Sequence, residues 1–143
     1  MGPIICATRG GEASYRTQER AIGLAKERNT ELVFLCVVDA SFAGPLDERL
    51  AAALDDELKR LGRSLLNIAE TRAQEQGVSA RTVCISGPVW ESIEGFLQEI
   101  NANTLVIGSS RSSAIDHAFG SGDVAEFAES LRQTVGVEVI VVT

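Results

Sequence analysis

Short apolar segments alternate along the chain with longer segments in which apolar residues recur at helical spacing. Five short segments are rich in β-branched aliphatic residues and predict strands. These are residues Ile4–Thr8, Glu31–Asp39, Ala80–Ser86, Thr104–Gly108 and Val137–Thr143. Nearly continuous apolar runs of this length are typical of parallel strands that are buried on both faces.

The intervening segments predict four helices, over residues Ser14–Arg28, Leu46–Gln76, Pro88–Asn101 and Gly122–Gln133. Asn29 and Gly77 are expected to end the first two helices, since both residue types tolerate a left-handed backbone. Gly62 stands in the middle of the long second helix and could mark a bend. One apolar stripe is predicted to bury this helix, formed by Leu50, Leu54, Leu58, Leu61, Leu65 and Ile68.

Strict alternation of strand and helix predicts an α/β fold, a doubly wound five-stranded parallel sheet with helices on both faces. Strand orders 2-1-3-4-5 and 3-2-1-4-5 both fit the pattern, and we take 3-2-1-4-5 as the prediction. Hydrophobic residues make up 45% of the 143 residues and aromatic residues 5%, so the core should be aliphatic. The absence of a linker or repeat predicts a single domain over residues 1–143.

Charge and cysteine content narrow the classes of function. A formal net charge of −7 argues against nucleic acid and anionic membrane surfaces as partners. Because neither a signal peptide nor a membrane span is evident, the chain is expected to be cytoplasmic. Cys6, Cys36 and Cys84 lie inside strand-like runs and are expected to be small buried hydrophobic residues. With no C-x-x-C motif and one histidine, no metal site is expected.

Two loops follow the first and fourth predicted strands, where parallel sheets bind ligands. The second loop, residues 108–123, is rich in Gly and Ser and leads into a helix N-terminus. Such a segment either cradles an anion with backbone amides or serves only as a solvated connection. His117 beside Asp116 is the single candidate general base, but no motif places a nucleophile near it. No catalytic residue is therefore predicted, and the chain is not expected to be an enzyme.

The two loops and their strands resemble the universal stress protein family. The resemblance rests on I-I-C-A-T-x-G-x-E-A-S at the start, on T-L-V-I-G-S-S-R-S after the third helix, and on G-x-V-A-E followed by V-E-V-I-V-V at the end. It spans the whole chain and implies a module of stress response or signalling. In nucleotide-binding members of this family the fourth strand ends in Gly-x-x-Gly, followed after nine residues by Gly-Ser or Gly-Thr.

This chain departs from the family motif at the positions nearest phosphate. Gly108 matches the first glycine, but Arg111 stands in place of the second, and Arg9 replaces the family's Asp after the first strand. The final pair is Gly120–Ser121 by residue type or Gly122–Asp123 by register. Val38 matches a position whose backbone meets adenine in the family. The candidate binding residues are Thr8, Arg9, Val38, Gly108, Ser109, Arg111, Gly120, Ser121 and Gly122.

The departures leave several interpretations open. Arg9 and Arg111 either pair with carboxylates and plug the crevice or form an arginine clamp for a small anionic ligand. The first predicts a degenerate crevice in which ATP or AMP is a doubtful ligand, and the second predicts a competent nucleotide site. A flavodoxin-like electron carrier is a further alternative. The apolar strand Val137–Thr143 predicts a homodimer that pairs through it, as is common in the family.

Overall fold

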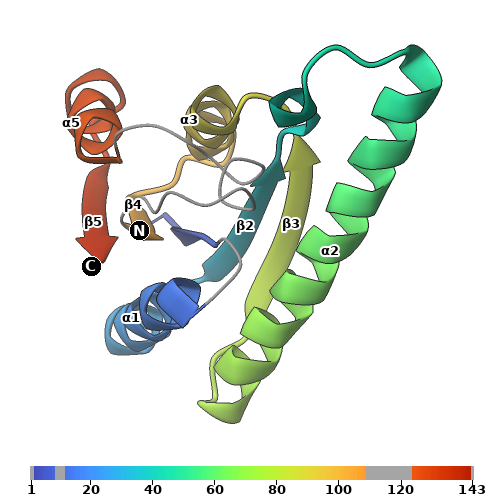
Figure 1. Cartoon of the computed structure of the whole chain (residues 1–143). Helices are drawn as coiled ribbons and strands as arrows, with labels where there is room; N and C mark the ends of the chain where they lie inside the picture. The colour runs from blue at the N-terminus through green and yellow to red at the C-terminus, as the bar shows by residue number, and fades with distance from the viewer. Residues whose placement is uncertain (1, 9–11, 109–123, 143) are drawn as a thin grey trace.

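A computed structural model describes residues 2–8, 12–108 and 124–142, and its centre is a five-stranded parallel sheet (Figure 1). The strands are β1 (Ile4–Ala7), β2 (Leu32–Val38), β3 (Ala80–Ser86), β4 (Thr104–Gly108) and β5 (Glu138–Val142). They follow the order β3-β2-β1-β4-β5, which confirms the predicted order. The order 2-1-3-4-5 was wrong, because β1 pairs with β2 on one side and with β4 on the other.

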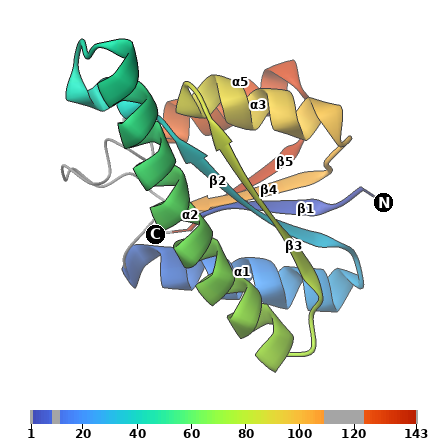
Figure 2. The same cartoon turned by 90° about the vertical axis from the view of Figure 1, so that its right-hand side faces the viewer.

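Helices cover both faces of the sheet. They are α1 (Glu12–Arg28), α2 (Glu48–Glu75), α3 (Val89–Glu99) and α5 (Val124–Thr134), and a short 3-10 helix, η1 (Ala40–Ala43), precedes α2. Figure 2 shows α1 and α2 on one face and α3 and α5 on the other. Strand and helix bounds differ from the predictions by up to two residues, and η1 was not predicted. No helix in the described ranges combines the length and apolar character that crossing a membrane requires.

The pleat of the strands divides the core into two layers. Ile4, Cys6, Phe34 and Val106 face α1 and α2. Their sequence neighbours, such as Ile5, face α3 and α5 instead. Every residue of β2 is buried, because this strand has a neighbour on each side and helices on each face. The sequence pattern of near-continuous apolar runs follows from this double coverage.

The ends of the helices use the residues that the sequence indicates. Asn29 adopts a φ of 52° directly after α1, and Gly77 adopts a φ of 79° after α2. Both are left-handed conformations that end a helix at low steric cost. At the other end of α2, the carboxylate of Asp47 accepts a hydrogen bond from the Leu50 amide at 2.9 Å. Asp47, and not the predicted Leu46, therefore fixes where α2 begins.

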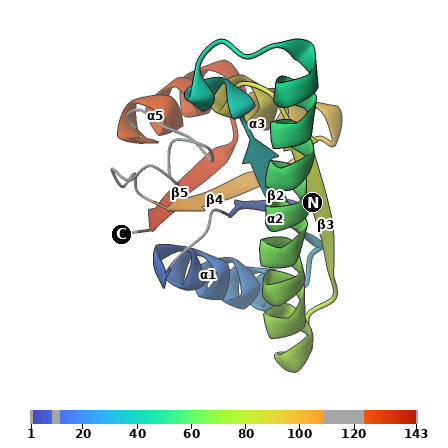
Figure 3. The ribbon, with the colours of Figure 1, turned by 45° about the vertical axis from the view of Figure 1, so that its right-hand side comes forward.

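The predicted buried stripe of α2 is confirmed at Leu58, with Leu54 and Leu65 partly buried against the core, and is wrong at its other three positions. Leu50, Leu61 and Ile68 expose 57%, 45% and 51% of their surface. The buried face is formed by Leu58, Gly62, Leu66, Ala69 and Ala73. Three of these five residues are glycine or alanine, which allow the helix axis to approach β2 and β3 closely. The larger leucines lie along the margin of the contact, and the N-terminal turns of α2 extend beyond the sheet (Figure 3).

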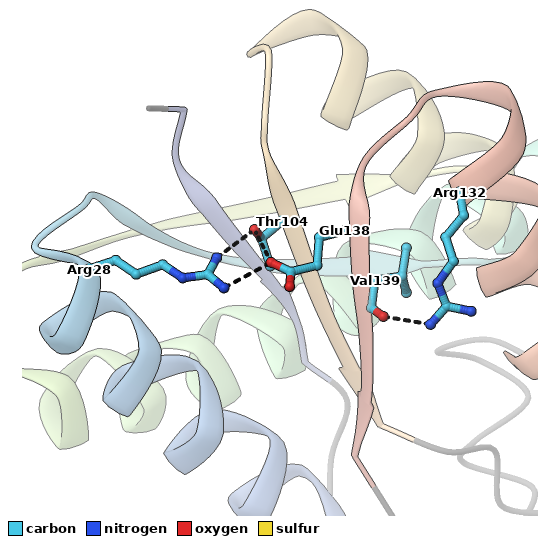
Figure 4. Close-up of polar contacts among 5 residues, drawn as sticks. All are labelled: Arg28, Thr104, Arg132, Glu138 and Val139. Carbon is cyan, nitrogen blue, oxygen red and sulfur yellow. Dashed lines mark hydrogen bonds and ion pairs between the residues drawn. The ribbon is translucent and has the colours of Figure 1, made fainter.

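A polar cluster joins α1 to the N-terminal ends of β4 and β5 (Figure 4). The Arg28 Nη1 donates to Thr104 Oγ1 at 3.0 Å, and Nη2 forms an ion pair with Glu138 Oε1 at 2.9 Å. The Thr104 hydroxyl in turn donates to Glu138 Oε1 at 3.1 Å. The pKa of Glu138 lies below its ordinary value, mainly because of the hydrogen bond from Arg28. Ligands bind at the opposite, carboxyl ends of parallel strands, so this cluster has a structural role.

Candidate functional site

The candidate site lies where the strands end at their carboxyl termini. β1 and β4 are the central neighbours from which the chain winds in opposite directions, which makes their junction the switch point of the sheet. Ala7 is in register with Ile107, so the next residues, Thr8 and Gly108, meet at this edge. Val38 ends β2 on the other side of β1. The fold thus brings together the three candidate residues that it describes.

The remaining candidate residues lie outside the described residues. They are Arg9, Ser109, Arg111, Gly120, Ser121 and Gly122. The same holds for the candidate base His117 and its neighbour Asp116. The placement of Thr8, Val38 and Gly108 at one edge is therefore a structural finding, while nucleotide contact by all nine residues stays a prediction.

Thr8 is linked to two helices by a chain of hydrogen bonds. Gln18 Nε2 donates to Thr8 Oγ1 at 2.8 Å, and both residues are almost completely buried. The Gln18 side-chain oxygen accepts from Arg72 Nη1 of α2 at 2.6 Å. Arg72 also stacks over the Tyr15 ring, with its guanidinium carbon 3.8 Å from the ring centroid. The threonine hydroxyl is therefore already engaged by a protein donor.

The backbone at Val38 is also engaged. Its carbonyl accepts a hydrogen bond from the Gly87 amide at 3.0 Å, and its side chain is fully buried. Gly87 has a φ of 146°, and a β-carbon there would come within 2.9 Å of the Ser92 hydroxyl. A glycine is thus required where the chain turns from β3 into α3. This turn is hydrogen-bonded to the end of β2 beside the candidate site.

The described residues beside Thr8 leave little internal space. A hollow of about 10 Å³ lies under α3, which is room for about one water molecule. Its walls are almost entirely apolar and consist of Ala7, Thr8, Leu35, Val37, Val89, Trp90, Ile93 and Ile107. Trp90 packs on Phe127 with ring centroids 4.5 Å apart, which joins α3 to α5 above the hollow. This hollow is far too small for a nucleotide.

The electrostatic features of this edge favour an anion over a cation. α1 begins at Glu12, four residues after Thr8, and its N-terminus carries a partial positive charge. No group of three or more His, Cys, Asp or Glu side chains within residues 2–8, 12–108 and 124–142 is arranged to hold a metal. Among the described residues of this edge, the N-terminus of α1 is a feature that attracts an anion.

Gln18 and Arg72 are the residues at this site that sequence reasoning missed. They are 54 positions apart, and no motif connects them. Gln18 gave one weak signal, because it is a polar residue on the buried face of a predicted helix. Arg72 gave none, since its position near β1 depends on how α2 is rotated over the sheet.

Comparison with known proteins agrees with this geometry. The model of the universal stress protein family matches residues 1–143. Universal stress protein MJ0531 of Methanocaldococcus jannaschii is 29% identical over 124 residues, which are 86% of this chain and 72% of that protein. Universal stress protein UspA of Lactobacillus plantarum superposes with a TM-score of 0.77 at 18% identity, covering 99% of this chain and 97% of that chain.

A second solved structure carries a ligand. It is a universal stress protein in complex with cAMP, similar to this chain with a TM-score of 0.69 and 22% identity, over 99% of this chain and 97% of that chain. At these identities the structures establish the shared fold. The family model matches from the first residue to the last, and the chain therefore belongs to the universal stress protein family.

Proposed function

We propose that this chain acts as a non-catalytic module in stress response or signalling, and that its crevice binds adenine nucleotides weakly or not at all. The observation that carries the proposal is Arg111. It stands at the second glycine of the family's Gly-x-x-Gly motif, in a chain that the family model matches throughout. A glycine there lets bare backbone approach a phosphate, whereas an arginine adds a long side chain in the same place.

Asp123 supports the same conclusion in the register that leads into α5. A carboxylate next to a helix N-terminus satisfies the free amides itself, as a cap does. It also repels a phosphate by roughly 4 kcal/mol, if the two charges are about 4 Å apart at an effective dielectric constant of 20. That amount is comparable to what two charge-assisted hydrogen bonds would return. In this register, repulsion by Asp123 would offset the favourable electrostatic interactions of a bound phosphate.

The contacts of Thr8 and Val38 also support weak nucleotide binding. The Thr8 hydroxyl is held by Gln18, and the Val38 carbonyl accepts from Gly87. A nucleotide would have to compete with these contacts or use only the remaining lone pairs. Neither residue offers the unsatisfied, buried polar group that marks a preformed binding site.

A competent site is the second candidate function, because a relative of the same fold was solved with cAMP. In that case Arg9 and Arg111 would clamp the phosphate from two loops, in the bidentate manner typical of guanidinium groups. The positive end of α1 would add to the attraction. The two candidates predict opposite changes in nucleotide affinity for one substitution. Arg111→Gly should strengthen binding if the arginine fills the crevice as a plug, and weaken it if the arginine clamps the phosphate.

Calorimetric titration and thermal unfolding with ATP, AMP and cAMP test the proposal. We expect stabilisation below about 1 kcal/mol at millimolar nucleotide, whereas a micromolar site would give about 4 kcal/mol. The double variant Arg9→Asp with Arg111→Gly should gain affinity. Arg60→Gly is the matched control, since the Arg60 side chain is 78% exposed in α2. Micromolar affinity in the native chain, lost in Arg111→Gly, would establish the clamp and refute the plug.

We also propose that the module forms a homodimer through the outer edge of β5. β5 is the last strand of the sheet, and Ile140, Val141 and Val142 are only half-buried by the described residues. The Glu138 amide donates to Asn103 on the β4 side, so alternate residues, Val139 and Val141, direct their backbone groups to the outer edge. An apolar strand edge of this kind is a template for pairing.

Arg132 limits where such pairing can begin. Its Nη2 donates to the Val139 carbonyl at 2.6 Å and so covers the first outward-facing group of β5 (Figure 4). Pairing between two copies should therefore centre on Val141. Sedimentation should show a dimer that Val141→Glu dissociates and that Arg132→Ala preserves or strengthens. Ile85→Glu on β3, the opposite edge strand, is the matched control. A monomeric native chain, or equal dissociation by the control, would refute this assembly.

A further inference from the structure

Two cysteines lie side by side in the sheet, away from the ends of the strands. Cys36 of β2 is directly in register with Cys84 of β3. Paired residues on neighbouring parallel strands are about 4.8 Å apart and point their side chains to the same face. That face is covered by α2, which crosses both strands (Figure 2). The fold therefore places two thiols next to each other beneath one helix.

Gly62 of α2 lies directly over both thiols. A β-carbon at this position would be 3.1 Å from the Cys36 Sγ and 3.1 Å from the Cys84 Sγ. The two sulfur atoms are consequently no farther apart than twice that distance. Their α-carbons, as paired residues of adjacent strands, fall in the range of about 4.4 to 6.8 Å that disulfides span. The register and the shared contact with Gly62 therefore place the two sulfurs near each other on one face of the sheet.

Access to the pair is unequal. Cys36 is completely buried, whereas Cys84 is partly exposed on the edge strand β3. This corrects the expectation that all three cysteines are buried. Cys84 lines a groove of about 280 Å³ between α2 and β3, together with Arg63, Leu66, Asn67 and Thr82. A small reagent can therefore reach Cys84 from solvent, whereas Cys36 is not exposed to it.

The charges around Cys84 favour its thiolate. The pKa of Cys84 is lowered to about 7, first by the hydrogen bond from Cys36 and then by the cations Arg63 and Lys59, while partial burial acts in the opposite direction. In its thiol form Cys84 donates to the Lys59 carbonyl at 3.9 Å. Asp55 opposes this effect, but its carboxylate pairs with Lys59 at 3.1 Å and accepts from Ser86 at 2.7 Å. Donation to Cys84, together with burial, raises the pKa of Cys36. One thiol of the pair is thus the nucleophile and the other a proton-bearing partner.

We propose that Cys84 and Cys36 form an oxidant-responsive site, in which a hydroperoxide oxidises Cys84 and Cys36 then closes a disulfide between β2 and β3. The Cys84 thiolate attacks one peroxide oxygen, the O–O bond breaks, and Cys84 sulfenic acid and hydroxide form. The Cys36 sulfur next attacks the Cys84 sulfur, the S–O bond breaks, and water leaves with the Cys36 proton. The two thiols supply the two electrons that reduce hydrogen peroxide to water.

The two cysteines are separate from the nucleotide motif and from the function proposed for it. The thiols lie between α2 and β3, and no step uses the loops after β1 and β4. Cys6 provides a control within the same chain. It is buried in β1, burial raises its pKa, and its thiol donates to the Thr17 carbonyl at 3.9 Å. It should therefore resist oxidation under conditions that oxidise Cys84.

The test uses the folded, reduced chain and substoichiometric hydrogen peroxide, with peptide mapping by mass spectrometry. We expect an intramolecular Cys36–Cys84 link, the loss of two hydrogen atoms from the intact mass, and no change at Cys6. Cys36→Ala should be oxidised more slowly, because Cys84 loses the hydrogen bond that favours its thiolate. The product should be Cys84 sulfenic acid, which dimedone traps, because the resolving thiol is gone. Cys84→Ser should form neither product, and Cys6→Ser should behave as the native chain does.

Because Cys36→Ala empties a buried position, a second measurement uses the native chain alone. Alkylation by iodoacetamide, followed at each cysteine as a function of pH, should be half-maximal for Cys84 near pH 7. At pH 7 a thiol with this pKa has about 15-fold more thiolate than an ordinary cysteine. Cys84 should react at least about tenfold faster than Cys6. Equal reactivity of Cys84 and Cys6, or disulfides formed only between chains, would overturn the proposal.

Discussion

Gly62 offers the most direct test of the packing between α2 and the sheet. An alanine at this position gains helix propensity, about 0.8 to 1.0 kcal/mol relative to glycine. It also places a methyl group 3.1 Å from the sulfurs of Cys36 and Cys84, inside ordinary contact distance. Cys36 is fully buried and has no room to yield, although Cys84 can move toward its groove. Overpacking of this kind costs typically 1 to 3 kcal/mol.

The two terms predict that Gly62→Ala destabilises the chain by about 1 kcal/mol, which lowers the melting temperature by about 3 °C. Gly23 of α1 and Gly95 of α3 are matched controls, since both are helical and a β-carbon there meets no atom within 4 Å. Each control substitution to alanine should stabilise the chain by up to about 1 kcal/mol. The three glycines therefore differ only in what the added methyl group touches.

Urea unfolding under reducing conditions measures these differences, with far-ultraviolet circular dichroism as the signal. The cost at Gly62 should shrink when Cys84→Ala removes one of the two sulfurs. A double-mutant cycle should give a coupling energy of about 0.5 to 1.5 kcal/mol between the two positions. Stabilisation of Gly62→Ala equal to that of Gly23→Ala would show that α2 does not approach the thiols as closely as described. Zero coupling to Cys84 would refute the assigned contact.

Three further predictions concern the polar cluster and the core. Arg28→Ala should lower the free energy of unfolding by about 1 to 2 kcal/mol, because the buried Thr104 hydroxyl loses its donor. Glu138 has a lowered pKa, so its contribution is present above its unfolded pKa and is lost as pH falls through the folded value. In Glu138→Gln the free energy of unfolding should fall less steeply as pH is lowered. The difference from the native chain should be less than about 1 kcal/mol, since the carboxylate is exposed. Leu66→Ala should lower the free energy of unfolding in urea by about 2 to 5 kcal/mol, because Leu66 is buried. Ile68→Ala should lower it by under about 0.5 kcal/mol, because Ile68 is exposed, although the sequence pattern placed Ile68 in the buried stripe.

The fold was predictable because its determinants are local or topological. Apolar runs identify the strands, alternation with helices makes the sheet parallel, and right-handed crossovers limit the orders. The meeting of Thr8 and Gly108 follows from the same rules, since both residues end strands that flank the switch point. Asn29 and Gly77 ended their helices as expected, because a left-handed residue is a local property.

The rotation of α2 was not predictable from periodicity alone. Its sequence carries leucines on one side and small residues on an adjacent side, and hydrophobicity favours the leucines as the buried face. The structure buries Gly62, Ala69 and Ala73 together with Leu58 and Leu66, and these small residues let α2 approach β2 and β3 closely. The contacts of Arg72 and Cys84 depend on this rotation, so both were missed.

The two proposed sites share one strand, and this has a consequence for how they would act. Cys36 and Val38 are two residues apart on β2, and both face the layer beneath α1 and α2. A disulfide from Cys36 to Cys84 would fix β2 against β3 just before the strand end that borders the crevice. If the crevice does bind a nucleotide, its affinity should therefore differ between reduced and oxidised chains, and the nucleotide should shift the thiol–disulfide equilibrium by the same factor. Titration of both forms separates the cases: equal affinity means that β2 does not couple the sites, and unequal affinity that Cys84→Ser abolishes means that it does.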